Sequence, residues 1–444
     1  MISLLSLAGC YGGPEAYMEG PAFAADNRPI LAEAAVPQII APPSLPVEGI
    51  SPHWETAPYT EGVTLGEAVR RALRFSPAVQ AAQIEIDAKR AENMQAGLRP
   101  NPSLAGEVQN VGQDEQQATL ELSQLIELGG KRLKRIRAAE LEMGVAAWDY
   151  EAARLRVASN TAQAFVDVLA SQSRIDVLTD LLAVSQKLAG AASERVQAGG
   201  ANPVEAKRAM IEIARAKADL SAERALVAVA KQRLANNWGS ENADFGRAEG
   251  QLATTNHLPS PGALSVYLDS NPDVARWATE MTRRKALVNI ARANAVPDLT
   301  IGAGVSRLES GDETGAILNL SVPIPLRNRN QGNIAAAETR IFKGERESLS
   351  AKIDVRSVFL EAYGRLVTAA EKLEALEKEV LPAAQEVYES TSTGYAEGKF
   401  ALLSVLDAQK TLFATRLEII NVRADFQKAK VQIEALIGRG LYDA

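Results

Sequence analysis

Residue types that carry out catalysis or bind transition metals are scarce in this sequence. The 444 residues include one cysteine, Cys10, and two histidines, His53 and His257. They form no CxxC pair, HExxH motif or Cys–His nucleophile, and the sequence contains no GxGxxG or Walker-type phosphate loop. The acidic residues are scattered without the spacing of a metal site. We therefore predict that the chain is not an enzyme and holds no cofactor and no metal.

Cys10 is the one candidate for covalent chemistry. The short apolar stretch from Ile2 to Ala8 leads into Leu7-Ala8-Gly9-Cys10, which resembles the bacterial lipoprotein signal, whose cysteine becomes the lipidated first residue. A full secretory signal also has basic residues before its apolar region, and none precedes Cys10. A misassigned or truncated start and an ordinary buried cysteine stay open beside lipidation. We predict that Cys10 is a lipid anchor.

The composition is typical of long packed helices. Apolar residues make up 46% of the chain but aromatic residues only 5%, and the net charge is −7. Because phosphate binding draws on clustered Lys and Arg, this charge argues against a nucleic-acid partner. The short basic cluster from Lys131 to Arg137 lies at an expected helix start and is typical of a solvated face. No stretch of about 18 uncharged apolar residues occurs, so a crossing of a membrane would need strands.

The second half of the chain repeats the first. Pro77 recurs as Pro272, 195 residues on, and Gly199 recurs as Gly398, 199 residues on. Further matches keep the same order, and so constant an offset indicates a tandem duplication. We divide the chain into a signal remnant at 1–10, an extended leader at 11–62, a first repeat at 63–245, a linker or equatorial segment at 246–261 and a second repeat at 262–440.

Each repeat is expected to begin with a helix and two short strands. The first helices are predicted at 64–98 and 262–296, and both end at prolines, which break helices. Apolar and polar residues alternate afterwards, which is typical of strands. The alternating segments are Leu104 to Val108 and Leu120 to Leu122 in the first repeat, and Leu299 to Val305 and Leu318 to Val322 in the second.

A very long helix follows in each repeat. Residues 131–197 contain no proline and, as one helix, would span about 100 Å. The counterpart at 332–396 is interrupted only by Pro382. Each long helix turns at a glycine, Gly199 or Gly398, into a returning helix of about 35 residues.

The returning helices carry an apolar seven-residue repeat. Such a repeat predicts a coiled-coil seam, in which side chains pack as knobs into close-fitting holes. A stand-alone cytoplasmic coiled coil would carry it too, but it would not explain strand pairs at the same place in both repeats. The repeat positions are Ala206, Ile213, Leu220, Val227 and Leu234 in the first helix, and Val405, Leu412, Ile419, Phe426 and Ile433 in the second.

The four strands of one chain are too few to cross a membrane alone. A small barrel needs about eight strands, and an open sheet edge in lipid leaves backbone groups unpaired. If these strands span a membrane, several chains must therefore pool them, and three chains would give twelve strands. We predict a mainly α fold with a small β part, in which a long α-helical coiled-coil barrel continues into a transmembrane β-barrel that three chains share, with four strands each.

Several motifs between residues 63 and 440 resemble the outer-membrane factors, the TolC-like efflux proteins. The forms Glu-Leu-Gly-Gly-Lys-Arg and Asn-Arg-Asn-Gln-Gly are similar to the branch that serves divalent heavy-metal efflux (CzcC-like). The motifs that carry the resemblance are Leu98-Arg99-Pro100-Asn101-Pro102, Ser123 to Arg132, Val322 to Leu326 with Asn328 to Asn330, and Gly394 to Gly398 followed by Val405 to Gln409.

This resemblance implies a homotrimer in the outer membrane of a Gram-negative bacterium, contacting outer-membrane lipid and extending into the periplasm. Its lower tips would meet a periplasmic adaptor (membrane fusion) protein, which joins it to an inner-membrane RND-type pump. It would serve as a passive duct for divalent heavy-metal cations. Two alternatives stay open: the same fold exporting drugs or peptides, and a structural coiled-coil protein of the cell envelope.

The resemblance also places a gate at the periplasmic end. Tyr395 matches the family's linking tyrosine, and Glu205 stands where its partner carboxylate lies. Asp407 matches one of two gate aspartates, whereas Ser404 occupies the other position and Phe400 replaces a family arginine. Without the resemblance, Tyr395 would be a packing residue, Glu205 a charge near a helix dipole, and Asp407 a solvated surface charge. Three copies of Asp407 around a narrow pore would favour cations.

The turns between the paired helices are the expected contact with the adaptor. Gly199, Gly200 and Gly398 have a structural reason to be glycine, because tight turns need positive φ. The resemblance adds adaptor contact to this role and extends it to Ala201 and Lys399.

Overall fold

The structure of the chain is a computed structural model that describes residues 62–112, 116–252, 258–308 and 312–440. Cys10, the signal remnant and nearly all of the expected leader lie outside these described residues. Helices make up most of the described chain, and strands a smaller part. Among the described helices, none has both the length and the hydropathy of a membrane-spanning helix.

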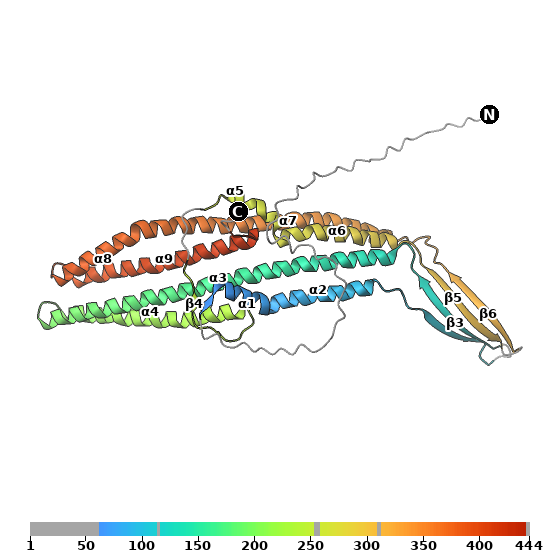
Figure 1. Ribbon diagram of the computed structural model, residues 1–444, viewed down its shortest axis with the longest axis horizontal. Helices are drawn as coiled ribbons and strands as arrows, with labels where there is room; N and C mark the ends of the chain where they lie inside the picture. The colour runs from blue at the N-terminus through green and yellow to red at the C-terminus, as the bar shows by residue number, and fades with distance from the viewer. Residues whose placement is uncertain (1–61, 113–115, 253–257, 309–311, 441–444) are drawn as a thin grey trace, which may run out of the picture. The chain divides into compact units, whose positions relative to one another are not determined.

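The first half of the chain has the predicted order of elements (Figure 1). The short strand β1 (Val63–Thr64) leads into α1 (Leu65–Phe75) and α2 (Pro77–Ala96). Two strands, a long helix and a returning helix follow. Their bounds are Ser103–Gln109 for β2, Gln117–Ile126 for β3, Lys131–Gln197 for α3 and Pro203–Asn236 for α4. The short strand β4 (Ala248–Glu249) then pairs in parallel with β1.

The second half has the same order of elements. It opens with α5 (Pro261–Ser265), the 3-10 helix η2 (Val266–Ser270) and α6 (Pro272–Ala293). Two strands and two helical segments joined by a π-helical turn follow, and the chain returns in a final helix. Their bounds are Leu299–Leu308 for β5, Glu313–Ser321 for β6, Gln331–Ala375 for α7, Leu376–Val380 for η3, Leu381–Ala396 for α8 and Leu402–Ile437 for α9.

The single helix predicted over 64–98 is wrong, because two helices occupy this segment. Ser76 separates them with an extended backbone (φ −60°, ψ 124°). Pro77 follows in the first turn of α2, and a proline ring pushes the preceding residue out of helical conformation. The same occurs before Pro272, so the helix predicted over 262–296 consists of α5, η2 and α6.

Both long helices start after a residue in the left-handed conformation. Gly130 (φ 68°) precedes α3 and Asn330 (φ 60°) precedes α7. α3 runs unbroken for 67 residues between the predicted bounds. In the second half, the helix widens into η3 next to Pro382, which has no N–H and would clash with the preceding turn of a regular helix. The predicted interruption is therefore a local π-turn, and the helix continues beyond it.

α3 packs against five other helices along its length, the first of which in chain order is α1. It contacts α2 and α6, and further along it contacts α4 and α9 (Figure 1). α7 packs against α6 and α9. The buried core between α7 and α9 is centred on Phe359, Leu366, Phe426 and Ile433. The seven-residue repeat of α9 is buried at all five predicted positions, as expected for a coiled-coil seam.

β2, β3, β5 and β6 form one antiparallel sheet in that order (Figure 1). The strand pairs of the two halves meet between β3 and β5. Because side chains alternate along a strand, the sheet has two distinct faces. In neighbouring rows across the sheet, the apolar face carries Leu104, Leu122, Ala303 and Leu318, and the polar face carries Ser103, Ser123, Gly302 and Asn319.

Candidate functional site

Two turns, which we call the hairpin tips, connect the paired helices. The first tip (198–202) joins α3 to α4, and the second (397–401) joins α8 to α9. Gly199 (φ 71°) and Gly398 (φ 79°) are left-handed. The amide after each glycine donates to the carbonyl five residues back, at 2.9 Å in the first tip and 2.7 Å in the second. This is the glycine-dependent Schellman end of a helix, so a side chain at either glycine would strain the turn.

The residues predicted to meet an adaptor all lie in the hairpin tips. Gly200 is exposed and Ala201 half-buried in the first tip. In the second tip, the Lys399 ammonium lies 2.6 Å from the Glu397 carboxylate, and both side chains are largely exposed. Backbone geometry therefore positions these residues, and all of them except the half-buried Ala201 are exposed to solvent.

Tyr395 and Glu205 are brought together by the two hairpin tips. Tyr395 lies in the last turn of α8 and is only 3% exposed, and Glu205 lies in the first turn of α4. The Tyr395 hydroxyl donates to Glu205 Oε2 at 3.4 Å, across 190 positions of sequence. Burial raises the pKa of the Tyr395 hydroxyl, and the Glu205 carboxylate raises it further. The hydroxyl therefore stays protonated and remains the donor.

Arg195 of α3 contacts the same tyrosine. This contact was not predicted from the sequence. The Arg195 Nη1 donates to the Tyr395 carbonyl at 2.7 Å, and its guanidinium lies over the Tyr395 ring, 4.5 Å from the centroid. The three residues Arg195, Tyr395 and Glu205, which we call the tip lock, thus join α3, α4 and α8. The only sequence signal was a basic residue in the last turn of a helix, which is common because it suits the helix dipole.

Phe400 lies against Gly394 at the second hairpin tip. A Cβ on Gly394 would come within 2.2 Å of the Phe400 ring, so only glycine admits the ring there. The Phe400 amide also donates to the Gly394 carbonyl at 3.2 Å. Phe400 remains 47% exposed, which leaves part of its ring on the surface of the tip.

Ser404 and Asp407 lie on α9 beyond the tip and do not touch the tip lock. Both side chains are exposed and, three residues apart, they face one side of the helix. In the described part of the chain, no ion pair or hydrogen bond reaches the Asp407 carboxylate. One turn on, Lys410 pairs with Glu212 of α4 at 3.3 Å and ties α9 to α4.

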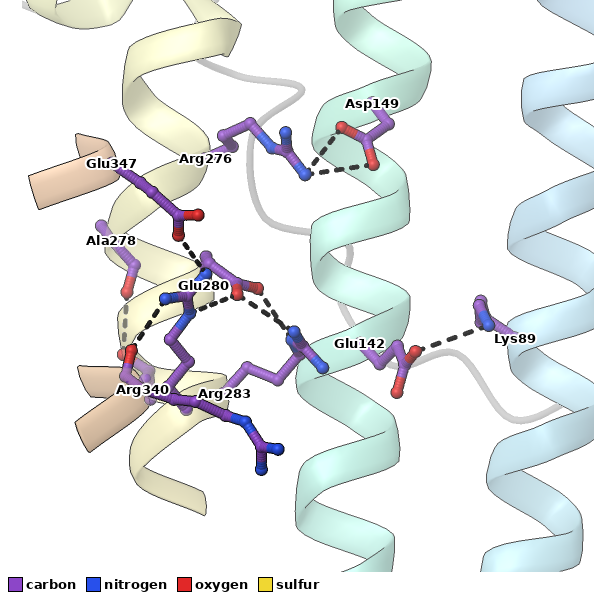
Figure 2. Close-up of polar contacts among 11 residues, drawn as sticks. Lys89, Glu142, Asp149, Arg276, Ala278, Glu280, Arg283, Arg340 and Glu347 are labelled. Atoms are coloured by element: carbon purple, nitrogen blue, oxygen red, sulfur yellow. Dashed lines mark hydrogen bonds and ion pairs between the residues drawn. The ribbon is translucent and has the colours of Figure 1, made fainter. Parts of the chain in front are cut away.

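A second group of charged side chains joins α6 to α7 (Figure 2). The buried Glu280 carboxylate accepts hydrogen bonds from Arg283 and Arg284, each through Nε at 2.7 Å. Burial raises its pKa, but the two hydrogen bonds and the positive charges of the two arginines together outweigh burial and lower the pKa overall. Arg284 continues to Glu347 of α7 at 2.7 Å, and it passes over Gly344, where a Cβ would lie 2.7 Å from Nη1. These charged side chains therefore have a structural role, because their hydrogen bonds hold α6 against α7.

Within the described ranges, no three His, Cys, Asp or Glu side chains come close enough together to hold a metal ion.

In each half, a long helical segment and its returning helix are joined at a hairpin tip. The same half also contains a pair of strands with one apolar and one polar face. These features define the class of outer-membrane efflux channels. The chain belongs to the outer membrane efflux protein family, whose family model matches residues 68–240 and 263–439, one match in each half. The predicted family resemblance is therefore confirmed. Proteins of this family are passive channels and not enzymes, which also decides against a purely structural envelope protein.

Curated relatives of the chain are heavy-metal resistance proteins. The chain is 32% identical over 377 residues to the cobalt-zinc-cadmium resistance protein CzcC of Cupriavidus metallidurans, covering 85% of this chain and 90% of the relative. It is 27% identical over 322 residues to the nickel-cobalt-cadmium resistance protein NccC of Alcaligenes xylosoxydans xylosoxydans, covering 70% of each.

Solved structures share the fold at low sequence identity. The CusC channel superposes with a TM-score of 0.71 at 19% identity, covering 85% of this chain and 92% of CusC. The outer membrane protein VceC of Vibrio cholerae superposes with a TM-score of 0.70 at 18% identity, covering 85% of this chain and 96% of VceC. Both likenesses establish the fold alone.

Proposed function

We propose that this chain is the outer-membrane channel of a tripartite efflux system, a passive duct for divalent heavy-metal cations. The observation that carries the proposal is the 32% identity to CzcC over nearly the whole of both chains. Efflux family members form trimeric channels that work with an adaptor and an inner-membrane pump. Deleting the gene should therefore sensitise cells to cobalt, zinc or cadmium. Unchanged sensitivity to these cations, with increased sensitivity to an organic toxin, would favour drug export.

The sheet supports a shared β-barrel in the outer membrane. Its apolar face is more exposed than its polar face in the single chain, the reverse of a sheet in water: Leu318 is 87% exposed, Leu320 70% and Leu104 68%. The sheet also ends in two open edges, β2 and β6. Lipid against the apolar face and neighbouring chains at both edges would satisfy both features.

The chain should accordingly be a trimer in mild detergent. Because β2 and β6 are open edges, an isolated chain leaves backbone groups unpaired in the membrane. Mass measurement of the purified protein should give three chains per particle, and planar bilayers should show conductance. A folded monomer that inserts into bilayers would contradict the shared barrel.

Lipidation of Cys10 anchors the same assembly in this proposal. The residue follows Leu7-Ala8-Gly9 and is the single cysteine of the sequence. Cys10→Ser should abolish labelling by a fatty-acid analogue in cells, while trimer formation persists because the sheet is unchanged. Equal labelling of the variant and the original chain would refute the assignment.

The hairpin tips form the periplasmic end of the duct in this proposal. The tip lock holds the two hairpins of a chain together, and its release lets them part. Asp407 and Ser404 face the lumen from α9, where three Asp407 carboxylates meet near the axis and attract cations. The tip residues receive the adaptor: the exposed Gly199, Gly200, Gly398 and Lys399 and the half-buried Ala201.

A further inference from the structure

Charge is distributed unevenly between the two faces of the four-stranded sheet. Register places Glu107, Glu121 and Glu313 on the polar face. Arg307, the single basic residue of these four strands, belongs to the apolar face near a strand end, where it pairs with Asp312. The polar face therefore carries three carboxylates per chain and no basic side chain in the described strands.

Glu121 differs from the other two acids because neighbouring strands hold its carboxylate, whereas the Glu107 carboxylate accepts from Gln109 of its own strand at 2.9 Å. Glu121 projects from β3 over Gly302 of β5, where a Cβ would come within 2.0 Å of its Oε1. Beyond that glycine, Asn319 of β6 donates to the same oxygen at 3.3 Å. The Glu121 side chain thus reaches from β3 over β5 to β6, and only a glycine at position 302 leaves space for its carboxylate.

Gly304 is the direct partner of Glu121 on β5 and brings the two strands close together. A Cβ at Gly304 would lie 2.4 Å from the Leu120 carbonyl oxygen and 2.9 Å from the Glu121 Cα. Both contacts are with backbone atoms, which cannot move aside as a side chain can. Gly304 therefore sets the close spacing of β3 and β5 at Glu121, and Gly302 leaves space for the Glu121 side chain.

No ion pair neutralises Glu121 among the described residues, and its one hydrogen-bond donor is a neutral amide. A carboxylate accepts at about four lone-pair positions, so one amide leaves most of its capacity open. Such a group, fixed in position and without a counter-ion, attracts mobile cations from solution.

We propose that Glu121 is a cation-selecting residue inside the barrel, separate from the periplasmic gate. The inference rests on the proposed trimeric duct, with the polar face of the sheet towards the lumen. Three Glu121 carboxylates at one height then form a ring that concentrates cations and excludes anions. Glu121 should attract both monovalent and divalent cations, because it supplies a fixed negative charge but no complete coordination shell that would select one ion.

The magnitude follows from Coulomb interaction. Three charges about 8 Å from an ion in water, screened over about 10 Å, change the local concentration of a monovalent ion by about threefold. Cations rise and anions fall by this factor, so the cation-to-anion permeability ratio changes by up to about tenfold.

The test is the reversal potential of the trimer in planar bilayers under a KCl gradient. Glu121→Gln keeps the side-chain shape and should lower the cation-to-anion ratio by about threefold to tenfold. Glu121→Lys should shift the preference further towards anions. Glu107→Gln is the matched control, because Glu107 is on the same face but is exposed and held only by Gln109 of its own strand, so its charge is less fixed over the sheet and it should give a smaller shift.

The outcomes separate this inference from the proposed duct. If the unmodified chain gives no conductance, the duct itself fails. If it conducts but Glu121→Gln leaves the reversal potential unchanged, or changes it no more than Glu107→Gln does, Glu121 does not select ions. Glu121→Lys decides the matter a second time if the glutamine variant assembles poorly.

Discussion

Replacing Arg195 by alanine is expected to hold the channel open for much more of the time. The guanidinium makes a 2.7 Å hydrogen bond to the Tyr395 carbonyl and lies 4.5 Å from its ring centroid. Arg195 is partly exposed, so its hydrogen bond and its cation–π contact should each contribute at the low end of the usual range. Together they stabilise the closed channel by about 1 kcal/mol per chain. If the three chains open together, the closed channel loses about 3 kcal/mol of stability relative to the open one. The ratio of open to closed channels then rises about a hundredfold.

The other arm of the tip lock should matter less. The Tyr395 hydroxyl lies 3.4 Å from Glu205, which is long for a hydrogen bond between oxygens. A bond of this length contributes about 0.5 kcal/mol per chain, so Tyr395→Phe should change the open-to-closed ratio about tenfold. Arg195→Ala is thus the larger effect, although the tyrosine was the residue predicted from the sequence.

Single-channel recording distinguishes these effects from general loss of stability. Arg195→Lys keeps the charge but loses the planar stack and its fixed donors, so it should open the channel nearly as often as alanine does. Arg224→Ala is the matched control, because Arg224 is exposed on α4 and lies 19 residues beyond Glu205, about 28 Å along the helix. Closed channels in both Arg195 variants, with unchanged trimer mass, would show that the lock does not gate.

The long helices were predictable because their limits are local. The pair Gly129-Gly130 precedes α3 and Gly199 follows it, and no proline lies between, so the predicted and observed bounds agree. The strand pairs were equally local, since alternation alone sets the two faces. A break was missed at Ser76, where a proline in the first turn of α2 starts a new helix inside a continuous apolar pattern.

The tip lock was only partly predictable. Tyr395 and Glu205 entered through family motifs, and no spacing in the sequence relates them, because they are 190 positions apart. Arg195 lies 200 positions from Tyr395, and its role depends on where two hairpins meet. Contacts of this kind depend on how helices pack, and the sequence pattern of either helix alone does not contain them.

Replacing Asp407 by asparagine is expected to weaken the block of conduction by divalent cations added from the periplasmic side. Asp407 is exposed, and no ion pair holds it among the described residues, so the substitution should leave the trimer intact. With three carboxylates removed near a narrow axis, the block should weaken about tenfold, because most of the local negative potential is lost. Open probability without divalent cations should not change, since the tip lock is untouched.

Ser404, which the family resemblance predicts to stand at the position of a second gate aspartate, allows the reverse experiment. Ser404→Asp adds a carboxylate about one turn from Asp407 on the same side of α9 and should strengthen the divalent block. Asp425→Asn is the matched control, because 18 residues are five full turns, so Asp425 is exposed on the same side but about 27 Å further along α9. An effect of Asp407→Asn no larger than that of Asp425→Asn would make Asp407 an ordinary surface charge. A block that depends on Asp407, grows with Ser404→Asp and ignores Asp425 would place the narrowest cation-binding ring at the hairpin tips, far from the proposed Glu121 ring in the barrel.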